Sequence, residues 1–210
     1  MYIPREFAET RREVLHGLVH AHSFATLVSN GPEDPVASHV PVLLVPERGE
    51  LGRLQFHLAR QNPHVELLAA GEPALAIFEG PHAYISPRWY VSPVTVPTWN
   101  YAVVHAYGRA RAMDDAQLAG HLRRLTEAYE PAEGGWTPER IPQDAFAGLR
   151  RGIVGFEIEI TRLEGKWKLG QNRRAEDVRG AVEGLQRVGN PEAVAVAQMM
   201  RAALEAKESD

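Results

Sequence analysis

The feature that most limits the fold is a series of extended segments joined by short turns. Three β-type runs, at residues 23–29, 36–45 and 53–58, are separated by clusters of Gly, Pro and Asp that mark connections. Strands joined by tight turns rather than by helices pair antiparallel. We therefore expect a mainly β fold with flanking helices (α+β), in which about six or seven strands form a closed or nearly closed barrel without exposed edges.

More strands are predicted further along the chain. "PALAIFEG" and "HAYISPRWY" read as two strands on either side of Gly80–Pro81, and residues 99–114 form a long β-branched and aromatic run. Residues 153–163 alternate most regularly: the apolar side chains share one face, and Glu157 and Glu159 share the other. We expect Gly165 to close a turn after this strand.

Helical periodicity predicts the remaining elements. The expected helices start after Pro4 and cover 62–70, 115–130, 174–188 and 191–206. A short helix is also expected in "AFAGLRRG". We assign residues 1–170 to the barrel domain and residues 171–210 to a C-terminal helical appendage.

Composition excludes several classes of function. The chain has no cysteine, so disulfides, thiolate metal sites and cysteine nucleophiles are excluded. The 27 acidic and 23 basic residues give a net charge of −4, which argues against a surface for polyanions. No signal peptide and no apolar run long enough to span a bilayer is present, so we expect a cytoplasmic protein without membrane contact.

The usual catalytic motifs are also missing. His16 and His20 lie one turn apart but lack the glutamate of a metalloprotease helix, and the other histidines are scattered, so no metal site is expected. There is no Gly-x-Ser-x-Gly turn and no Gly-x-Gly-x-x-Gly loop.

One short stretch has two interpretations. "HLARQNPH" places Arg60, the candidate helix cap Asn62 and Pro63 where a strand ends and a helix begins. In the first interpretation Asn62 caps the helix and Arg60 is solvated. In the second, Arg60 and the helix start bind an anion.

Six blocks of the chain resemble one family. "MYIPREF", "ASHVPVLL", "HLARQNPH", "AIFEGPHAYISPRWY", "VPTWNYAVVHAYG" and "IVGFEIEITRLEGKWKLGQNR" occur in this order over residues 1–174. Together they resemble the PaiB family of FMN-binding negative transcriptional regulators. The resemblance implies a split β-barrel of the FMN-binding type, in a homodimer with FMN at the interface.

The resemblance also implies which residues bind FMN. Arg60 and Asn62 would contact the phosphate, and the flavin would be lined by Ser38, His39, His57 and Ala59. The residues expected to close the pocket, partly from the second chain, are Trp99, Asn100, Tyr101, Lys168 and Gln171. Gly170 stands where the family often has Ser, so a ligand contact made by that hydroxyl would be weaker here.

The function itself stays open among three hypotheses. The first is a flavin-binding transcriptional regulator, whose only candidate DNA-reading surface is the C-terminal helical pair, where arginines alternate with acids. The second is a flavin-dependent oxidoreductase acting on a small molecule, with His39, Tyr101 and His105 as candidate proton donors and no assigned catalytic residue. The third is a non-catalytic binding protein with a vestigial pocket.

Overall fold

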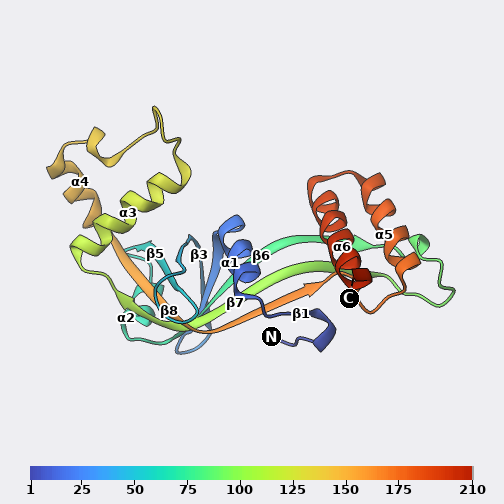
Figure 1. The fold of residues 1–210 in the computed structure, drawn as a ribbon. Helices are drawn as coiled ribbons and strands as arrows, with labels where there is room; N and C mark the ends of the chain where they lie inside the picture. The colour runs from blue at the N-terminus through green and yellow to red at the C-terminus, as the bar shows by residue number, and fades with distance from the viewer. Residues whose placement is uncertain (210) are drawn as a thin grey trace. The chain divides into compact units, whose positions relative to one another are not determined.

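The computed structural model describes residues 1–209 (Figure 1). The helices are α1 (Arg12–Ala21), α2 (His64–Ala69), α3 (Asp115–Tyr129), α4 (Gln143–Arg150), α5 (Ala175–Val188) and α6 (Pro191–Ser209). The strands are β1 (Ala8–Glu9), β2 (Phe24–Asn30), β3 (Pro35–Pro41), β4 (Leu43–Val45), β5 (Arg53–Ala59), β6 (Pro73–Ile85), β7 (Thr98–Ala112) and β8 (Ile153–Lys168). Short 3-10 helices are η1 (Arg5–Phe7), η2 (Pro87–Trp89) and η3 (Pro138–Arg140).

The chain divides into two compact units. Unit 1 contains Met1–Leu18, Glu79–Val104 and the described residues from Glu164 onward, and unit 2 contains Val19–Phe78 and His105–Leu163. The long strands β6, β7 and β8 each contribute residues to both units.

Unit 2 contains the barrel. The strands of the sheet follow the order β3-β2-β6-β7-β8-β5-β4, and the pairs β2–β3, β2–β6, β4–β5 and β5–β8 are antiparallel. The strands at the two ends of this order, β3 and β4, are separated in the chain by Val42 alone, so the sheet curls back on itself. The interior is apolar, and Phe56 stacks on Phe156 with ring centroids 5.9 Å apart. The predicted α+β fold of the split-barrel type is confirmed, but the sheet ends at β3 and β4 and is not closed, so the expectation of a closed barrel without exposed edges is wrong.

Two glycines that we read as turns lie instead inside long strands. β6 continues through Gly80, where a Cβ would lie 2.8 Å from Leu18 Cδ1 and 3.1 Å from the Ala102 oxygen. β8 continues through Gly165, which pairs with Glu9 of β1 and where a Cβ would lie 2.1 Å from Leu15 Cδ2. In both cases glycine permits close packing and does not form a turn.

Other boundaries differ locally. The predicted strand 36–45 is divided into β3 and β4 at Val42, whose N–H donates to the Ser23 carbonyl instead of to a ladder partner (2.8 Å). The first α-helix begins at Arg12, because Pro4 precedes η1 and β1.

The helix predicted over 115–130 is confirmed as α3, and a capping box joins Asp114 to Gln117 at its start. Its buried face is not purely apolar. Leu118 and His121 are buried, whereas Tyr129 is exposed. α3 therefore packs within unit 2 partly through a polar residue.

In unit 1, α5 and α6 lie side by side (Figure 1) and share one apolar core with the end of β6 and with Leu169. Trp89 of η2 fills the space above Gly180 and Gly184 of α5. The two predicted C-terminal helices are confirmed, and the domain boundary at residue 170 stays a prediction. Within residues 1–209, the structure contains no helix with the length and apolar character that crossing a membrane requires.

Candidate functional site

Ser38, Asn62 and His64 form a hydrogen-bonded cluster in unit 2. The Ser38 hydroxyl lies 3.0 Å from His64 Nδ1 and accepts a hydrogen bond from Asn62 Nδ2 at 3.2 Å. Asn62 Oδ1 in turn accepts from the His64 backbone N–H (2.9 Å), so Asn62 closes the turn that starts α2. Ser38 and Asn62, which are both predicted FMN contacts, thus lie within hydrogen-bond distance of each other.

His64 is the member that sequence reasoning missed. It is fully buried, burial lowers its pKa, and its Nε2 atom has no hydrogen-bond partner among residues 1–209. The only available signal was its position at the end of "HLARQNPH".

Arg60 contacts the polypeptide backbone. Its Nε and Nη2 atoms donate to the carbonyls of Arg151 (2.7 Å) and Ile153 (3.0 Å), and its backbone N–H donates to Gly152 (2.8 Å). The guanidinium thus holds the segment that leads from α4 into β8. Ala59 is exposed and pairs with Ile153 across the β5–β8 ladder.

His39 lies on the opposite face of β3 from Ser38. It is exposed, its Nδ1 lies 3.2 Å from Thr26 Oγ1, and its ring stacks on Phe24 with centroids 6.3 Å apart. Adjacent residues of a strand point to opposite faces, so the structure does not bring these two predicted contacts together.

His57 is paired with a residue that was not predicted. Its Nδ1 atom lies 3.2 Å from Nε2 of His121, which belongs to α3 and is 0% exposed. Burial lowers the pKa of both histidines; for His121, burial, the charge of His57 and that of Arg124 lower the pKa to about 3. Both rings are therefore neutral at physiological pH.

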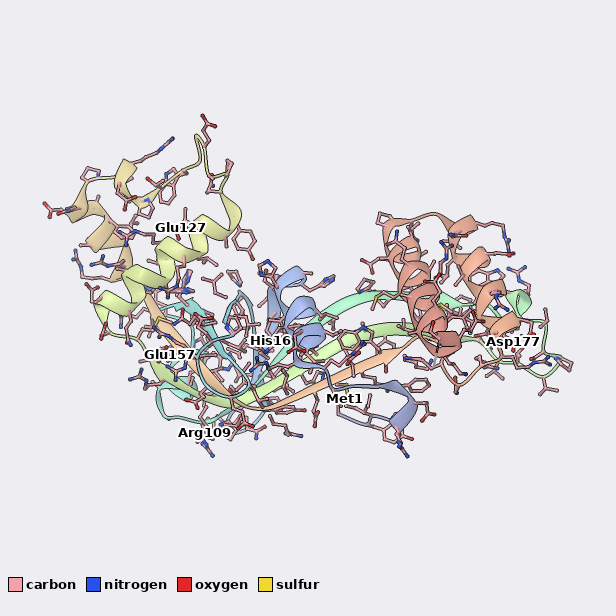
Figure 2. All side chains as sticks on the ribbon, in the orientation of Figure 1. Met1, His16, Arg109, Glu127, Glu157 and Asp177 are labelled. Atoms are coloured by element: carbon pink, nitrogen blue, oxygen red, sulfur yellow. The ribbon has the colours of Figure 1, made fainter. Side chains whose placement is uncertain are left out.

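A cluster of polar side chains centred on Glu157 lies beside the His57–His121 pair. Glu157 was predicted on the polar face of its strand, yet it is 3% exposed (Figure 2). Arg53 and Arg111 contact its Oε1 at 3.0 and 2.5 Å, and Gln55 Nε2 contacts its Oε2 at 3.3 Å. Burial alone would raise the pKa of Glu157, but these hydrogen bonds and the two arginine charges lower it below its ordinary value.

Unit 1 presents an aromatic surface. Trp99 is 54% exposed, and its ring centroid lies 6.1 Å from that of Tyr84 and 6.2 Å from that of His82. Beside it is a cavity of about 300 Å³, which we call the aromatic cavity. Its lining residues are Glu79, Gly80, His82, Trp99, Tyr101, Ala102 and Val103.

A cation lies next to this surface. Lys166 Nζ is 5.3 Å from the centre of the Tyr101 ring, within the range of a cation–π contact. Trp99 and Tyr101, which are both predicted FMN contacts, line the aromatic cavity.

The other predicted residues of unit 1 make structural contacts. Asn100 is buried, with Nδ2 3.3 Å from Met200 Sδ. Lys168 donates to Thr98 and to the Trp99 carbonyl, and burial followed by the charges of nearby cations lowers its pKa. Gln171 bonds to the backbone of Trp167 and Leu169 at the end of β8.

Comparison with known proteins identifies the family. The family FMN_bind_2, described as "Putative FMN-binding domain", matches residues 1–162. The chain belongs to this family. FMN is accordingly its cofactor, as the resemblance implied.

A relative supports the same conclusion. The chain is 36% identical over 203 residues to "Protease synthase and sporulation protein PAI 2" of Bacillus subtilis (strain 168), covering 95% of this chain and 96% of the relative. The predicted similarity to PaiB is confirmed. The chain is also 30% identical over 242 residues to the uncharacterized protein AN0679 of Emericella nidulans, covering 96% of each.

Two solved structures share the fold. The FAD and heme binding protein from Mycobacterium smegmatis matches with a TM-score of 0.61 and 19% identity, covering 83% of this chain and 79% of that one. The flavocytochrome Anf3 from Azotobacter vinelandii matches with a TM-score of 0.61 and 16% identity, covering 79% and 72%. At these identities the similarity concerns the fold alone.

Proposed function

We propose that this member of the FMN-binding family is an oxidoreductase for a small molecule, with the flavin ring in the aromatic cavity. Bound FMN supplies the hydride or electron transfer, so the chain itself needs to bind, orient and exchange protons. The observation that carries the proposal is the exposure of Trp99 at the edge of a cavity that Tyr101 also lines.

The chemistry of the cavity fits a planar ring. Large exposed aromatic side chains are unfavourable in water and mark binding surfaces. Trp99 and Tyr101 offer apolar faces, and Lys166 beside Tyr101 adds a positive charge for an electron-rich or anionic ring system.

His82 supplies a group for proton exchange. Its side chain is half exposed at the cavity, its Nδ1 lies 3.8 Å from Glu192 Oε2, and its backbone N–H donates to the same oxygen at 3.0 Å. Imidazole is the side chain suited to exchanging protons near neutral pH. We propose that His82 positions or protonates the molecule that reacts with the flavin.

Purification and titration test this function. The isolated protein should be yellow, and a reduced nicotinamide or another electron donor should bleach the flavin band. Trp99→Ala should weaken FMN binding at least tenfold, about 1.4 kcal/mol, by flavin fluorescence titration. Trp136→Ala, at an exposed tryptophan of unit 2, is the matched control. Equal affinity of both variants and the native chain would contradict the placement.

The predicted contacts Ser38, His39, His57, Ala59, Arg60 and Asn62 belong to unit 2 and stay a separate prediction. Arg60 and Asn62 are assigned to the phosphate, and the assignment draws support from the family match over residues 1–162. Arg60 uses Nε and Nη2 on backbone carbonyls, so Nη1 is the atom without a hydrogen bond in the described chain.

We also propose that two copies associate through the loop between η2 and β7. Val91, Val94 and Val96 are exposed there, Val94 by 90%. Asp177 fixes the start of this loop, so the apolar side chains are presented with little loss of freedom on binding. Sedimentation velocity should show a dimer that Val94→Glu dissociates and that Val188→Glu, at another exposed valine, leaves intact.

Regulation by DNA binding is the second candidate, because the chain resembles the PaiB family along most of its length. The C-terminal helices give it little support: Arg179 pairs with Glu208 (2.5 Å), and Arg187 and Arg174 also face acids. A salt-sensitive and sequence-selective mobility shift with promoter DNA would favour this candidate over the oxidoreductase.

A further inference from the structure

A second cavity lies in unit 2, beside β4 and α3. It has a volume of about 230 Å³, the space of roughly eight water molecules in the liquid. The lining residues are Leu43, Leu44, Val45, Pro46, Glu47, Arg48, Gln55 and Arg124. None of them lines the aromatic cavity of unit 1.

The two arginines of this cavity lack acidic partners. Neither Arg48 nor Arg124 has a carboxylate oxygen within 4.0 Å in the described part of the chain. Other arginines nearby are paired: Arg123 contacts Glu139 at 3.1 Å, and Arg111 contacts Glu157 at 2.5 Å. Two guanidinium groups thus border one hollow in a chain of net charge −4.

The buried side chain of Gln55 holds Arg124 in position. Its Nη2 atom donates to Gln55 Oε1 at 2.7 Å, and Gln55 is 3% exposed. Gln55 Nε2 contacts Glu157, which Arg53 and Arg111 fix in turn. A guanidinium that is fixed on one side keeps its other N–H groups for a ligand and loses little entropy on binding.

The remaining lining indicates the size and charge of the ligand. Leu43, Leu44, Val45 and Pro46 supply a predominantly apolar wall. Glu47 is the single acid against two arginines, so one negative charge on the ligand would balance the cavity. The planar fork of arginine matches the two oxygens of a carboxylate.

We propose that this cavity is a second ligand site, which binds a small monocarboxylic acid. The carboxylate contacts Arg124 and Arg48, and the short aliphatic or aromatic body contacts the segment Leu43–Pro46. The site lies outside the proposed flavin-ring cavity, so loss of acid binding and loss of FMN binding are separable.

Isothermal titration calorimetry on the full-length, FMN-loaded protein tests this proposal. The probes are butyrate and benzoate, with butyramide, benzamide and inorganic phosphate as comparisons. We expect the two acids to bind and the neutral amides to bind at least tenfold more weakly, because the amides lack the charge that the arginines recognise. Equal binding of acids and amides, or no binding of either acid, would overturn the proposal, and so would phosphate binding as tight as that of the acids.

Three variants locate the binding. Arg124→Met and Arg48→Met should each weaken benzoate binding at least tenfold, whereas Arg123→Met, next to Arg124 but outside this cavity, should leave it unchanged. The flavin absorbance spectrum of each variant reports separately on the FMN site. Arg48 forms no hydrogen bond or ion pair with Gln55 or Glu157, so the Arg48→Met variant remains informative if Arg124→Met impairs folding. Native affinity in Arg48→Met and Arg124→Met would refute the assignment.

Discussion

Nδ1 of His57 and Nε2 of His121 lie 3.2 Å apart, and a single shared proton joins β5 to α3. Only one of the two facing nitrogens can carry that proton. A second proton there would turn one ring into an imidazolium, point two N–H groups at each other and place a positive charge in a buried site beside Arg124. The contact therefore requires that one of the two facing nitrogens stays unprotonated.

From the His57–His121 pair we predict that acid lowers the free energy of unfolding. The pKa of His121 is about 3 in the folded chain, against about 6.5 when unfolded. The unfolded chain thus binds more protons below pH about 6.5, and stability falls as the pH drops from there toward 3. The loss from His121 reaches about 2 kcal/mol at pH about 5.

Urea unfolding at several pH values measures this effect. His121→Leu should flatten the pH dependence between these limits, whereas His82→Gln, at a half-exposed histidine, should retain it. If the stability of His121→Leu depended on pH as that of the native chain does, the His57–His121 pair would not be the source of the pH dependence.

We predict that Asp177 keeps the exposed loop at residues 91–98 ordered. Its side chain is labelled in Figure 2 and is 1% exposed, and it accepts hydrogen bonds from Val91 N (2.9 Å), Ser92 N (3.0 Å) and Ser92 Oγ (2.6 Å). Asp177→Ala leaves these donors without a partner, and we expect a loss of about 1–3 kcal/mol. Limited proteolysis should cut the segment 91–98 faster in the variant, and Glu183→Ala, an exposed acid of the same helix, is the control.

The pH dependence of this anchor has a definite sign. Burial alone would raise the pKa of Asp177, but the hydrogen bonds from Ser92 and Val91 and the charge of Arg173 outweigh it and lower the pKa. The anchor therefore stabilises the fold above the unfolded pKa of about 4 and is lost as the pH falls below it. Protection of the loop from proteolysis that increases with acidity would contradict this.

The lack of a side chain at Gly184 allows α5 and η2 to pack tightly. A Cβ at this position would lie 2.2 Å from the Trp89 ring, so Gly184→Ala should destabilise unit 1 by about 1–3 kcal/mol. Gly17→Ala in α1 meets no atom within 4 Å and should instead stabilise its helix by up to about 1 kcal/mol. Opposite shifts of the thermal unfolding midpoint are expected, and equal shifts would disprove the packing argument.

Arg60 combines a structural contact with a predicted cofactor contact. Arg60→Ala removes two hydrogen bonds to the segment Arg151–Ile153 and should raise amide hydrogen exchange there. If the guanidinium also binds the phosphate, FMN affinity falls at least tenfold, about 1.4 kcal/mol. Riboflavin, which lacks the phosphate, is the control ligand: an equal loss for both ligands would assign Arg60 to structure alone.

Most of the fold prediction depended on patterns among residues that are close together in the sequence. The strand alternation around Phe156 and the two C-terminal helices depend on residues a few positions apart, which the sequence displays directly. Gly80 and Gly165 were misread because a glycine that forms a turn and a glycine that admits a neighbouring atom look the same in one dimension.

The candidate site was predictable only in part. Trp99 and Tyr101 were recognised by residue type and by resemblance, and they do line one cavity. Ser38 and His39 were both assigned to the flavin by resemblance, although a strand sends adjacent side chains to opposite faces. His121 carried no local signal, and His64 carried only its position at the end of "HLARQNPH".

By itself, the sequence determined the family, the α+β class and the positions of most strands and helices, because turn residues and hydrophobic periods are local properties. Only the tertiary structure decided that Glu157 and His121 are buried, that Arg60 holds a backbone segment and that Arg124 borders a cavity. The physical reason is that burial and charge pairing depend on partners distant in the chain, such as His57 and His121 at a separation of 64 residues. The free energy of a buried polar group is set by those partners and not by its neighbours in sequence.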